Sequence, residues 1–203
     1  MSYLKSSQTR ETLLKTTASL LRSKGYAAMG LSDIVKKSGI PKGSLYYHFP
    51  AGKEELAAAA VRFAGKAMLA SLSRLIEKTG NPIAGLQAFF NYYILQLDES
   101  GYRDGCPLAT VALETASGVP LVQKACAGAF SDYGKLLAGQ LVHCGAAPEK
   151  ADAWATQIIS SVEGALLLAK AQNDTNPLIV MRDQLTEQLT LSLPSLTSMA
   201  EQK

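Results

Sequence analysis

The stretch SGIPKGSLYYHFPAGKEEL, residues 38–56, places a basic and aromatic cluster in a chain that is otherwise rich in Ala and Leu. Pro41 suits the first position of a helix, because the N–H that proline lacks has no partner there. The helix should end near Phe49 and Pro50, since proline cannot continue a helix interior. The stretch therefore predicts a short helix that carries Lys, Tyr and His side chains between two turns.

On a helical wheel at about 100° per residue, this segment has two distinct faces. Leu45 and Phe49 form an apolar stripe that can pack on the preceding residues. The opposite face and its two shoulders carry small, flat or polar side chains: Gly43, Ser44, Tyr46, Tyr47 and His48. Such a helix can lie in a DNA groove, with its outward face toward base edges and its shoulders toward phosphates. Burial of the tyrosines in a core is the alternative, which the wheel excludes for Tyr47 and leaves open for Tyr46.

The residues before this segment predict two further helices and a tight turn. One helix should run over about residues 7–24 and stop at Gly25, and a short one over about residues 31–38 should stop at Gly39. A short helix, a tight turn and an outward-facing second helix make a helix-turn-helix, here at about residues 30–49.

The charge of the chain is divided unevenly along the sequence. Residues 1–53 hold nine Lys or Arg and two acidic residues, whereas the remaining 150 residues hold 11 basic and 15 acidic groups. The net charge of +3 thus hides a basic first quarter and an acidic remainder. A basic region next to a predicted helix-turn-helix favours contact with a polyanion such as DNA.

Apolar residues recur at intervals of three and four through almost the whole chain, and nothing alternates as a strand does. The predicted fold class is therefore all-α, with about nine helices. We expect an N-terminal three-helix helix-turn-helix domain over residues 1–51 and a C-terminal helical domain over residues 52–203. The later helices should span about residues 53–78, 82–100, 108–116, 120–144, 148–172 and 176–193.

Cysteine and histidine usage argues against a metal site. The three cysteines, Cys106, Cys126 and Cys144, form no CxxC pair, and the chain has only two histidines. Buried free thiols are the simpler interpretation. A redox-sensing Cys106 is the alternative.

The sequence offers no set of residues for catalysis, so we expect no enzyme and no cofactor. His143 and Cys144 are adjacent, and neighbours on a helix do not face each other. The glycine-containing segment GCPLA lacks the Lys-Ser/Thr ending of a phosphate-binding loop. No uninterrupted apolar run reaches the roughly 18 residues of a membrane span, so a cytoplasmic protein without a membrane partner is expected.

Together, the first helix and GLSDIVKKSGIPKGSLYYHFPAGKEEL resemble the N-terminal domain of the TetR family of transcriptional repressors. The family hallmark is a helix-turn-helix that closes on a Tyr-x-His-Phe run and is followed by a Lys at the start of helix 4. The resemblance covers about residues 9–56. The extra residue before that Lys, and GCPLATVALE at 105–114, resemble the branch of lincomycin-resistance and flavonoid-responsive (LmrA/YxaF-like) repressors.

This resemblance implies a set of DNA-contacting residues. They are Ser32, Lys42, Gly43, Ser44, Tyr46, Tyr47, His48 and Lys53. Lys42, Gly43 and Tyr47 would approach bases, whereas Tyr46, His48 and Lys53 would hold phosphates and Ser32 would be a further backbone contact.

Two positions depart from the family pattern. Gly30 stands where a Thr usually caps the second helix, which predicts a cap weaker by about a few tenths of a kcal/mol. Pro41 stands where a Ser is frequent, which removes one hydroxyl that could hold a phosphate.

The acidic remainder is expected to dimerise, to sense a ligand, or both. The last two helices combine small residues with leucines, and burial within one subunit is as compatible with this pattern as a dimer. The resemblance favours a homodimer, built as a four-helix bundle, that binds a palindromic operator on double-stranded DNA. The interface would include Ser161, Gly164, Ala165, Leu168, Met181 and Leu185.

Aromatic residues on the long helices suggest a pocket for a small-molecule effector. The candidates are Phe89, Phe90, Tyr93, Phe130, Tyr133, Trp154 and Glu163. Each aromatic could equally be packed core, and an apolar or aromatic, neutral-to-cationic effector is expected. A DNA-binding regulator controlled by redox or by a protein partner is the alternative, and activation instead of repression stays open.

Overall fold

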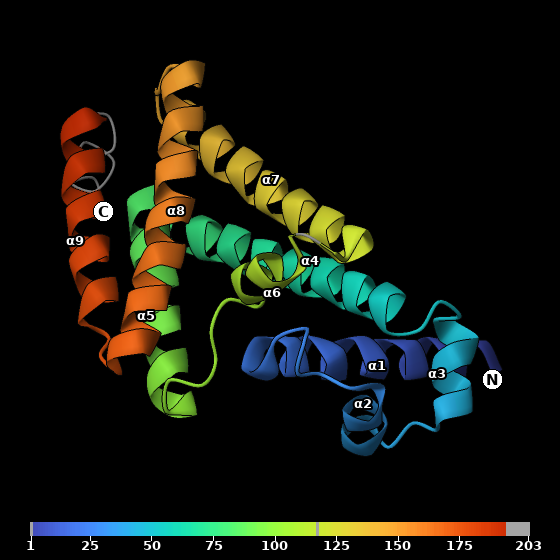
Figure 1. Ribbon diagram of the computed structural model, residues 1–203. Coiled ribbons are helices and arrows are strands. Elements are labelled where there is room, and N and C mark those ends of the chain that lie inside the picture. The colour runs from blue at the N-terminus through green and yellow to red at the C-terminus, as the bar shows by residue number, and fades with distance from the viewer. Residues whose placement is uncertain (1, 117, 194–203) are drawn as a thin grey trace. The chain divides into compact units, whose positions relative to one another are not determined.

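The helix boundaries follow local stop and start signals in the sequence. The computed structural model describes residues 2–116 and 118–193, and within these ranges it has nine helices and no strand (Figure 1). The helices are α1 (Ser2–Lys24), α2 (Leu31–Ser38), α3 (Lys42–His48), α4 (Lys53–Thr79), α5 (Pro82–Ser100), α6 (Pro107–Thr115), α7 (Pro120–His143), α8 (Pro148–Gln172) and α9 (Asn176–Ser192). The all-α prediction is confirmed; residues 194–203 of the predicted second domain lie outside the described residues.

The chain packs as two compact units. The first unit combines residues 1–67 with residues 106–130, and the second combines residues 68–105 with residues 131–203. The first unit therefore holds the whole helix-turn-helix region together with the start of α4, the helix α6 and the start of α7. Both α4 and α7 continue from the first unit into the second.

The core of the first unit forms around α1. Leu13 and Leu21 of this helix are fully buried, as the three- and four-residue spacing of its apolar positions predicts. Helices α2, α3 and α6 all contact α1, and they bury Ile34 of α2 and Leu45 of α3. Apolar contacts thus hold the helix-turn-helix on the side that faces α1, and its other side is open to solvent.

The second unit forms where α5, α8 and α9 pack together (Figure 1). Phe90 of α5 and Leu178 and Leu185 of α9 are completely buried there. Helix α5 also approaches the end of α4 closely, because a Cβ atom added to Gly85 would lie 2.7 Å from Cγ1 of Ile76. A side chain at position 85 would therefore push these two helices apart.

Helix α4 is long and largely apolar, although its apolar residues form no uninterrupted run. Among the described residues it is the one helix long and apolar enough to cross a membrane by length and composition alone. Arg62 and Lys66 interrupt its apolar residues, which is why no uninterrupted run exists in the sequence. Its alanines 57–60 are buried, and their small side chains let neighbouring helices approach.

Candidate nucleic-acid interface and ligand cavity

The turn between α2 and α3 is set by one glycine. Gly39 ends α2 in a left-handed conformation with φ of 69°, and its N–H donates to the carbonyl of Val35 at 3.0 Å. The hydroxyl of Ser38 accepts from the N–H of Ile40 at 3.1 Å. Pro41 follows as the cap of α3, so the helix proper begins one residue later than the sequence predicted.

The start of α2 is capped by an aspartate from within the helix. Gly30 has no side chain to offer, and its N–H donates instead to Oδ2 of Asp33 at 3.1 Å. The ammonium of Lys24 lies 3.4 Å from the same oxygen. The Gly30 N–H first, and then Lys24, hold the pKa of Asp33 below its usual value. The weak cap expected from Gly30 is thus supplemented by Asp33.

Helix α3 is anchored by the apolar stripe that the helical wheel predicted. Leu45 and Phe49 are both buried, and the guanidinium carbon of Arg10 lies 5.3 Å from the centroid of the Phe49 ring. Burial of this stripe fixes the rotation of α3 on α1. The residues on the opposite side of α3 must therefore point outward.

The outward side of α3 presents a tyrosine and a glycine. Tyr47 is 77% exposed, and its ring stands edge-on to the ring of His48, with centroids 5.1 Å apart. Lys42 and Gly43 are exposed, and no atom lies within 4 Å of the position that a Gly43 Cβ would take. Packing inside the chain therefore does not require glycine at position 43.

The side chains that flank the outward side of α3 are less exposed than Tyr47. Tyr46 is 40% exposed; its ring lies beside Gly52 and 5.8 Å from the ammonium of Lys42. Ser44 and His48 are half-buried. Tyr46 is thus partly packed against the chain and partly exposed. This lies between the two alternatives for it, burial in the core and full exposure toward DNA.

Lys53, at the first position of α4, is turned toward the loop between α1 and α2. Its ammonium lies 4.4 Å from the centroid of the Tyr26 ring and 3.5 Å from the carbonyl oxygen of Ala27. Ser32 is exposed near the start of α2. All eight residues predicted to contact DNA are exposed or half-buried, and all lie in the first unit.

Two carboxylates that sequence reasoning missed join this region to α6 and α7. Glu114 of α6 accepts a hydrogen bond from the N–H of Ala27 at 2.7 Å, and it fills the space beside Gly25. Glu54 of α4 accepts one from the N–H of Leu121, at the start of α7, at 3.1 Å. These partners are 87 and 67 residues apart along the chain, so no local pattern could have indicated them.

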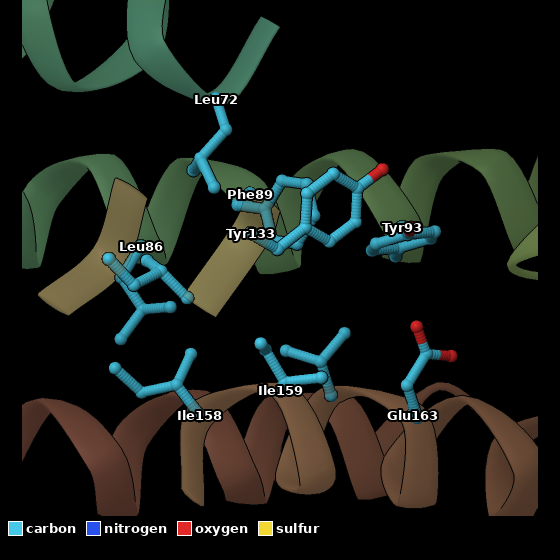
Figure 2. Close-up of a pocket in the computed structure, with 10 residues that line it drawn as sticks. Leu72, Leu86, Phe89, Tyr93, Tyr133, Ile158, Ile159 and Glu163 are labelled. Carbon is cyan, nitrogen blue, oxygen red and sulfur yellow. The ribbon is translucent and has the colours of Figure 1, made fainter. Parts of the chain in front are cut away.

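A cavity lies within the second unit between α4, α5, α7 and α8 (Figure 2). The space between its side chains, including the part open to solvent, is about 390 Å³. It is lined by Leu72, Leu86, Phe89, Tyr93, Tyr133, Leu137, Ile158, Ile159, Val162 and Glu163. The rings of Phe89 and Tyr93 meet edge-on at 5.1 Å, and the carboxylate of Glu163 extends from α8 into the cavity.

Four of the seven residues predicted for a pocket line this cavity together: Phe89, Tyr93, Tyr133 and Glu163. The other three lie elsewhere. Phe90 is completely buried, Trp154 is half-buried on α8 away from the lining, and Phe130 belongs to the first unit. The aliphatic residues of the cavity wall were not predicted. Leucine and isoleucine at helical spacing are as typical of a packed core as of a cavity lining.

A second hollow of about 350 Å³ adjoins the cavity. The two share Leu72, Leu86, Leu137 and Ile158 in their walls. The second hollow continues past these residues to Gln140, which is its one polar side chain, and is otherwise lined by Ile76, Pro82, Ile83, Leu141 and Leu189. The four shared residues therefore belong to the walls of both apolar spaces.

The residues predicted for a dimer interface divide into two groups. Ala165 and Leu185 are buried within the chain itself, whereas Ser161 and Met181 are half-buried. Gly164 and Leu168 are exposed, and Leu168 is 51% exposed. The outer side of α8 and α9 also carries large apolar side chains that the prediction did not include: Leu167, Val180 and Leu191.

None of the three cysteines forms a disulfide, and all three are buried. Burial raises the pKa of Cys126 to about 11 and also raises the pKa of Cys144. A buried thiol with a raised pKa is a poor nucleophile, because the thiolate is the reactive form. Within the described residues, no group of three or more His, Cys, Asp or Glu could hold a metal ion.

Comparison with known proteins gives matches to both parts of the chain. Residues 13–60 match the family described as bacterial regulatory proteins, tetR family, and residues 82–184 match the LmrA/YxaF-like C-terminal domain of transcriptional regulators. The uncharacterized HTH-type transcriptional regulator YxaF of Bacillus subtilis is 35% identical over 87% of this chain and 92% of its own. The HTH-type transcriptional regulator LmrA of the same organism is 32% identical over 84% of this chain and 90% of its own. A TetR transcriptional regulator from Legionella pneumophila superposes with a TM-score of 0.78 at 29% identity, over 88% of this chain and 95% of that one.

Proposed function

Because the chain belongs to the TetR family of bacterial regulatory proteins and carries the LmrA/YxaF-like C-terminal domain, we propose how this DNA-binding transcriptional regulator works. It is a homodimeric repressor, and a small apolar or aromatic effector releases it from a palindromic operator. Residues 1–51 form the DNA-binding domain and residues 52–203 the effector-binding and dimerisation domain. Its place is the cytoplasm, where chromosomal DNA is accessible.

The observation that carries the DNA-binding assignment is the division of α3 into a buried and an exposed side. Leu45 and Phe49 hold the helix to α1, while Tyr47 projects outward with 77% of its surface exposed. An exposed aromatic next to an open glycine is unfavourable for stability alone, but it suits a helix that enters a major groove. The basic residues around it supply the phosphate attraction.

The dimer interface is proposed on the outer side of α8 and α9. Gly164 allows close approach of a partner helix, and Leu167, Leu168 and Leu191 are apolar side chains that a second copy would cover. Ala165 and Leu185 support the interface indirectly. They are buried and hold α8 and α9 together within each subunit. A two-fold dimer would place two α3 helices on half-sites about 34–36 Å apart or a multiple of that distance.

The cavity in the second unit is proposed as the effector site. In the described conformation it has room for a water molecule, so an effector must displace the side chains of its wall. Helix α7 contributes Tyr133 to that wall, and the start of the same helix is bound by Glu54 through the Leu121 N–H. Displacement of α7 would thus reach the DNA-binding region, with a coupling free energy of about 1–3 kcal/mol as is typical of allosteric proteins.

The DNA-binding proposal is tested by Tyr47→Ala in a gel-shift titration on the DNA upstream of the chain's own gene. Loss of one base-contacting side chain in each subunit should weaken binding by roughly tenfold or more. Tyr92→Ala, which truncates a partly exposed tyrosine of α5, is the matched control and should leave DNA affinity unchanged. Sedimentation should give the same oligomeric state for both variants. Unchanged DNA affinity of Tyr47→Ala would refute the assignment of α3.

Control by redox is less well supported than control by a small ligand. All three thiols are buried, and the pKa of Cys126 and of Cys144 is raised. The alternative predicts that treatment with peroxide or a thiol-specific oxidant changes DNA affinity. The effector proposal predicts that DNA affinity stays constant under such treatment.

A further inference from the structure

We propose that Tyr26, in the loop between α1 and α2, is a positioning residue that holds Lys53 ready for a DNA phosphate. This inference rests on the proposed function, because it takes Lys53 as a phosphate contact of the DNA-binding domain. Three observations carry it: the contacts of the Lys53 ammonium, the hydrogen bonds that fix the loop, and the charge that stays available for DNA.

The side chain of Lys53 is held by the ring of Tyr26. Its ammonium lies 4.4 Å from the ring centroid, within the range of a cation–π interaction. The same ammonium donates a long hydrogen bond of 3.5 Å to the carbonyl of Ala27. Both Tyr26 and Lys53 are half-buried, which restricts the positions that their side chains can take. A lysine that is already ordered loses less conformational entropy when it binds a phosphate.

The loop that presents Tyr26 is fixed by hydrogen bonds on either side of the ring. Gly25, before it, has a left-handed φ of 77°, and its N–H donates to the carbonyl of Leu21 at 2.9 Å. The N–H of Ala27, after it, donates to Oε2 of Glu114 at 2.7 Å. The ring therefore stands on a backbone that is held at both neighbouring residues, and it can act as a support for the lysine.

The positive charge of Lys53 stays available for DNA. An aromatic face attracts an ammonium without neutralising it, whereas a carboxylate would pair with it. The adjacent carboxylate, Glu54, accepts a hydrogen bond from the N–H of Leu121 at 3.1 Å. Tyr26 also stays uncharged at neutral pH, since burial first and Glu54 second raise the pKa of its hydroxyl. Lys53 can therefore exchange its long contact with the loop carbonyl for a phosphate oxygen while it remains on the ring.

The test measures the DNA affinity of the full-length protein by fluorescence anisotropy at a series of salt concentrations. The probes are a duplex from upstream of the chain's own gene and a duplex of mixed sequence, because phosphate contacts carry no sequence information. Lys53→Gln should weaken binding to both. It should also lower the slope of log affinity against log salt by about 2, because each of two subunits loses one phosphate contact. Lys66→Gln, which removes an exposed charge from the same helix, is the matched control and should leave affinity and slope unchanged.

Variants of Tyr26 then form a double-mutant cycle with Lys53→Gln. Tyr26→Leu should weaken DNA binding by roughly 5-fold or more, because the lysine of each subunit must then become ordered on binding. In the Lys53→Gln background the same change should cost less than about twofold, since the ring has no ammonium to hold. Tyr26→Phe keeps the ring face and should bind DNA like the unmodified protein. Tyr102→Leu, at a half-buried tyrosine of the second unit, is the control and should leave DNA affinity unchanged.

A fluorinated ring at position 26 separates electrostatic attraction from packing. A phenylalanine that is trifluorinated on its ring has nearly the shape of phenylalanine, but its face is less negative and attracts an ammonium less strongly. The protein that carries it should therefore bind DNA more weakly than Tyr26→Phe does. Because both proteins keep an aromatic ring, this measurement decides the proposal even if Tyr26→Leu fails to fold.

The outcomes separate this inference from the proposed function. Equal losses from Tyr26→Leu in the two backgrounds, or no loss in either, would overturn the positioning role and leave Lys53 as a phosphate contact. Tyr26→Phe binding as weakly as Tyr26→Leu would also overturn it, because the hydroxyl would then act instead of the ring face. Unchanged affinity and salt slope of Lys53→Gln would overturn both the positioning role and the phosphate contact, while the DNA-binding assignment depends only on the Tyr47 experiment.

Discussion

Replacement of Gly43 by alanine should separate the stability of the protein from its affinity for DNA. Gly43 is the second residue of α3, and no atom lies within 4 Å of the position of the added Cβ. Alanine is favoured over glycine in a helix by about 0.5–1 kcal/mol. Because position 43 is in the first turn, we expect a gain near the lower limit, which raises the melting temperature by about 1–2 °C in a chain of this size.

The same methyl group should weaken DNA binding. It would lie on the outward side of α3, one turn before Tyr47, where the proposed interface brings base edges close to the helix backbone. Inserting a methyl group into a close-packed contact typically costs about 1–3 kcal/mol. We therefore expect the operator affinity to fall by roughly 5- to 150-fold, measured by fluorescence anisotropy at fixed salt concentration.

The matched control for this prediction is Gly139→Ala. Gly139 is an exposed glycine within α7, and no atom lies within 4 Å of its Cβ position either. This variant should also be more stable, with unchanged DNA affinity. If Gly43→Ala is stabilised and still binds the operator like the unmodified protein, position 43 does not approach DNA. If Gly43→Ala is destabilised, the position of the added Cβ is not as open as the structure describes it.

Three further changes test other parts of the molecule. Gly85→Ala should lower the free energy of unfolding in urea by about 1–3 kcal/mol, because its Cβ would lie 3.0 Å from Cα of Ile76, an atom that cannot move without the α4 backbone. Asp33→Asn should be less stable than the unmodified protein at neutral pH. Because the folded-state pKa of Asp33 is lowered, that difference should be lost as the pH falls below about 4 and through the lowered value, as urea unfolding at a series of pH values would show. The thiol of Cys126, with a pKa raised to about 11, should react with Ellman's reagent at neutral pH only at the rate at which the protein unfolds.

The parts of the fold that could be predicted from the sequence are those specified by adjacent residues. Gly39 ends α2, and Pro50 follows the end of α3, because a left-handed turn and an imino acid act on their immediate neighbours. Asn81 starts α5 in the same local way, with Oδ1 accepting from the N–H of Ile83 at 2.8 Å. The wheel for α3 succeeded for the same reason, since a seven-residue helix has one buried side and Leu45 and Phe49 mark it.

The candidate cavity was only partly predictable, because its walls come from four helices. Aromatic residues drew attention as pocket candidates, yet Phe90 packs in the core while Leu72 and Ile159 line the space. Nothing in the periodicity of α5 distinguishes Phe89 from Phe90: both are apolar and both are buried. Only the position of α8 opposite α5 decides which of the two rings faces an opening.

The hydrogen bonds of Glu114 and Glu54, which would transmit a signal, could not be predicted from the sequence for a related reason. A glutamate such as Glu114, on an exposed helix position, ordinarily reads as a solvated charge. Its carboxylate becomes informative only because α6 packs on α1 and brings it to the Ala27 N–H at 2.7 Å. Since that N–H is exposed, loss of the bond should cost little stability, because water can replace the acceptor. A larger loss of effector response than of stability would therefore identify Glu114 and Glu54 as transmitting contacts, and mutational tests of release should begin with them instead of with the aromatic residues of the cavity.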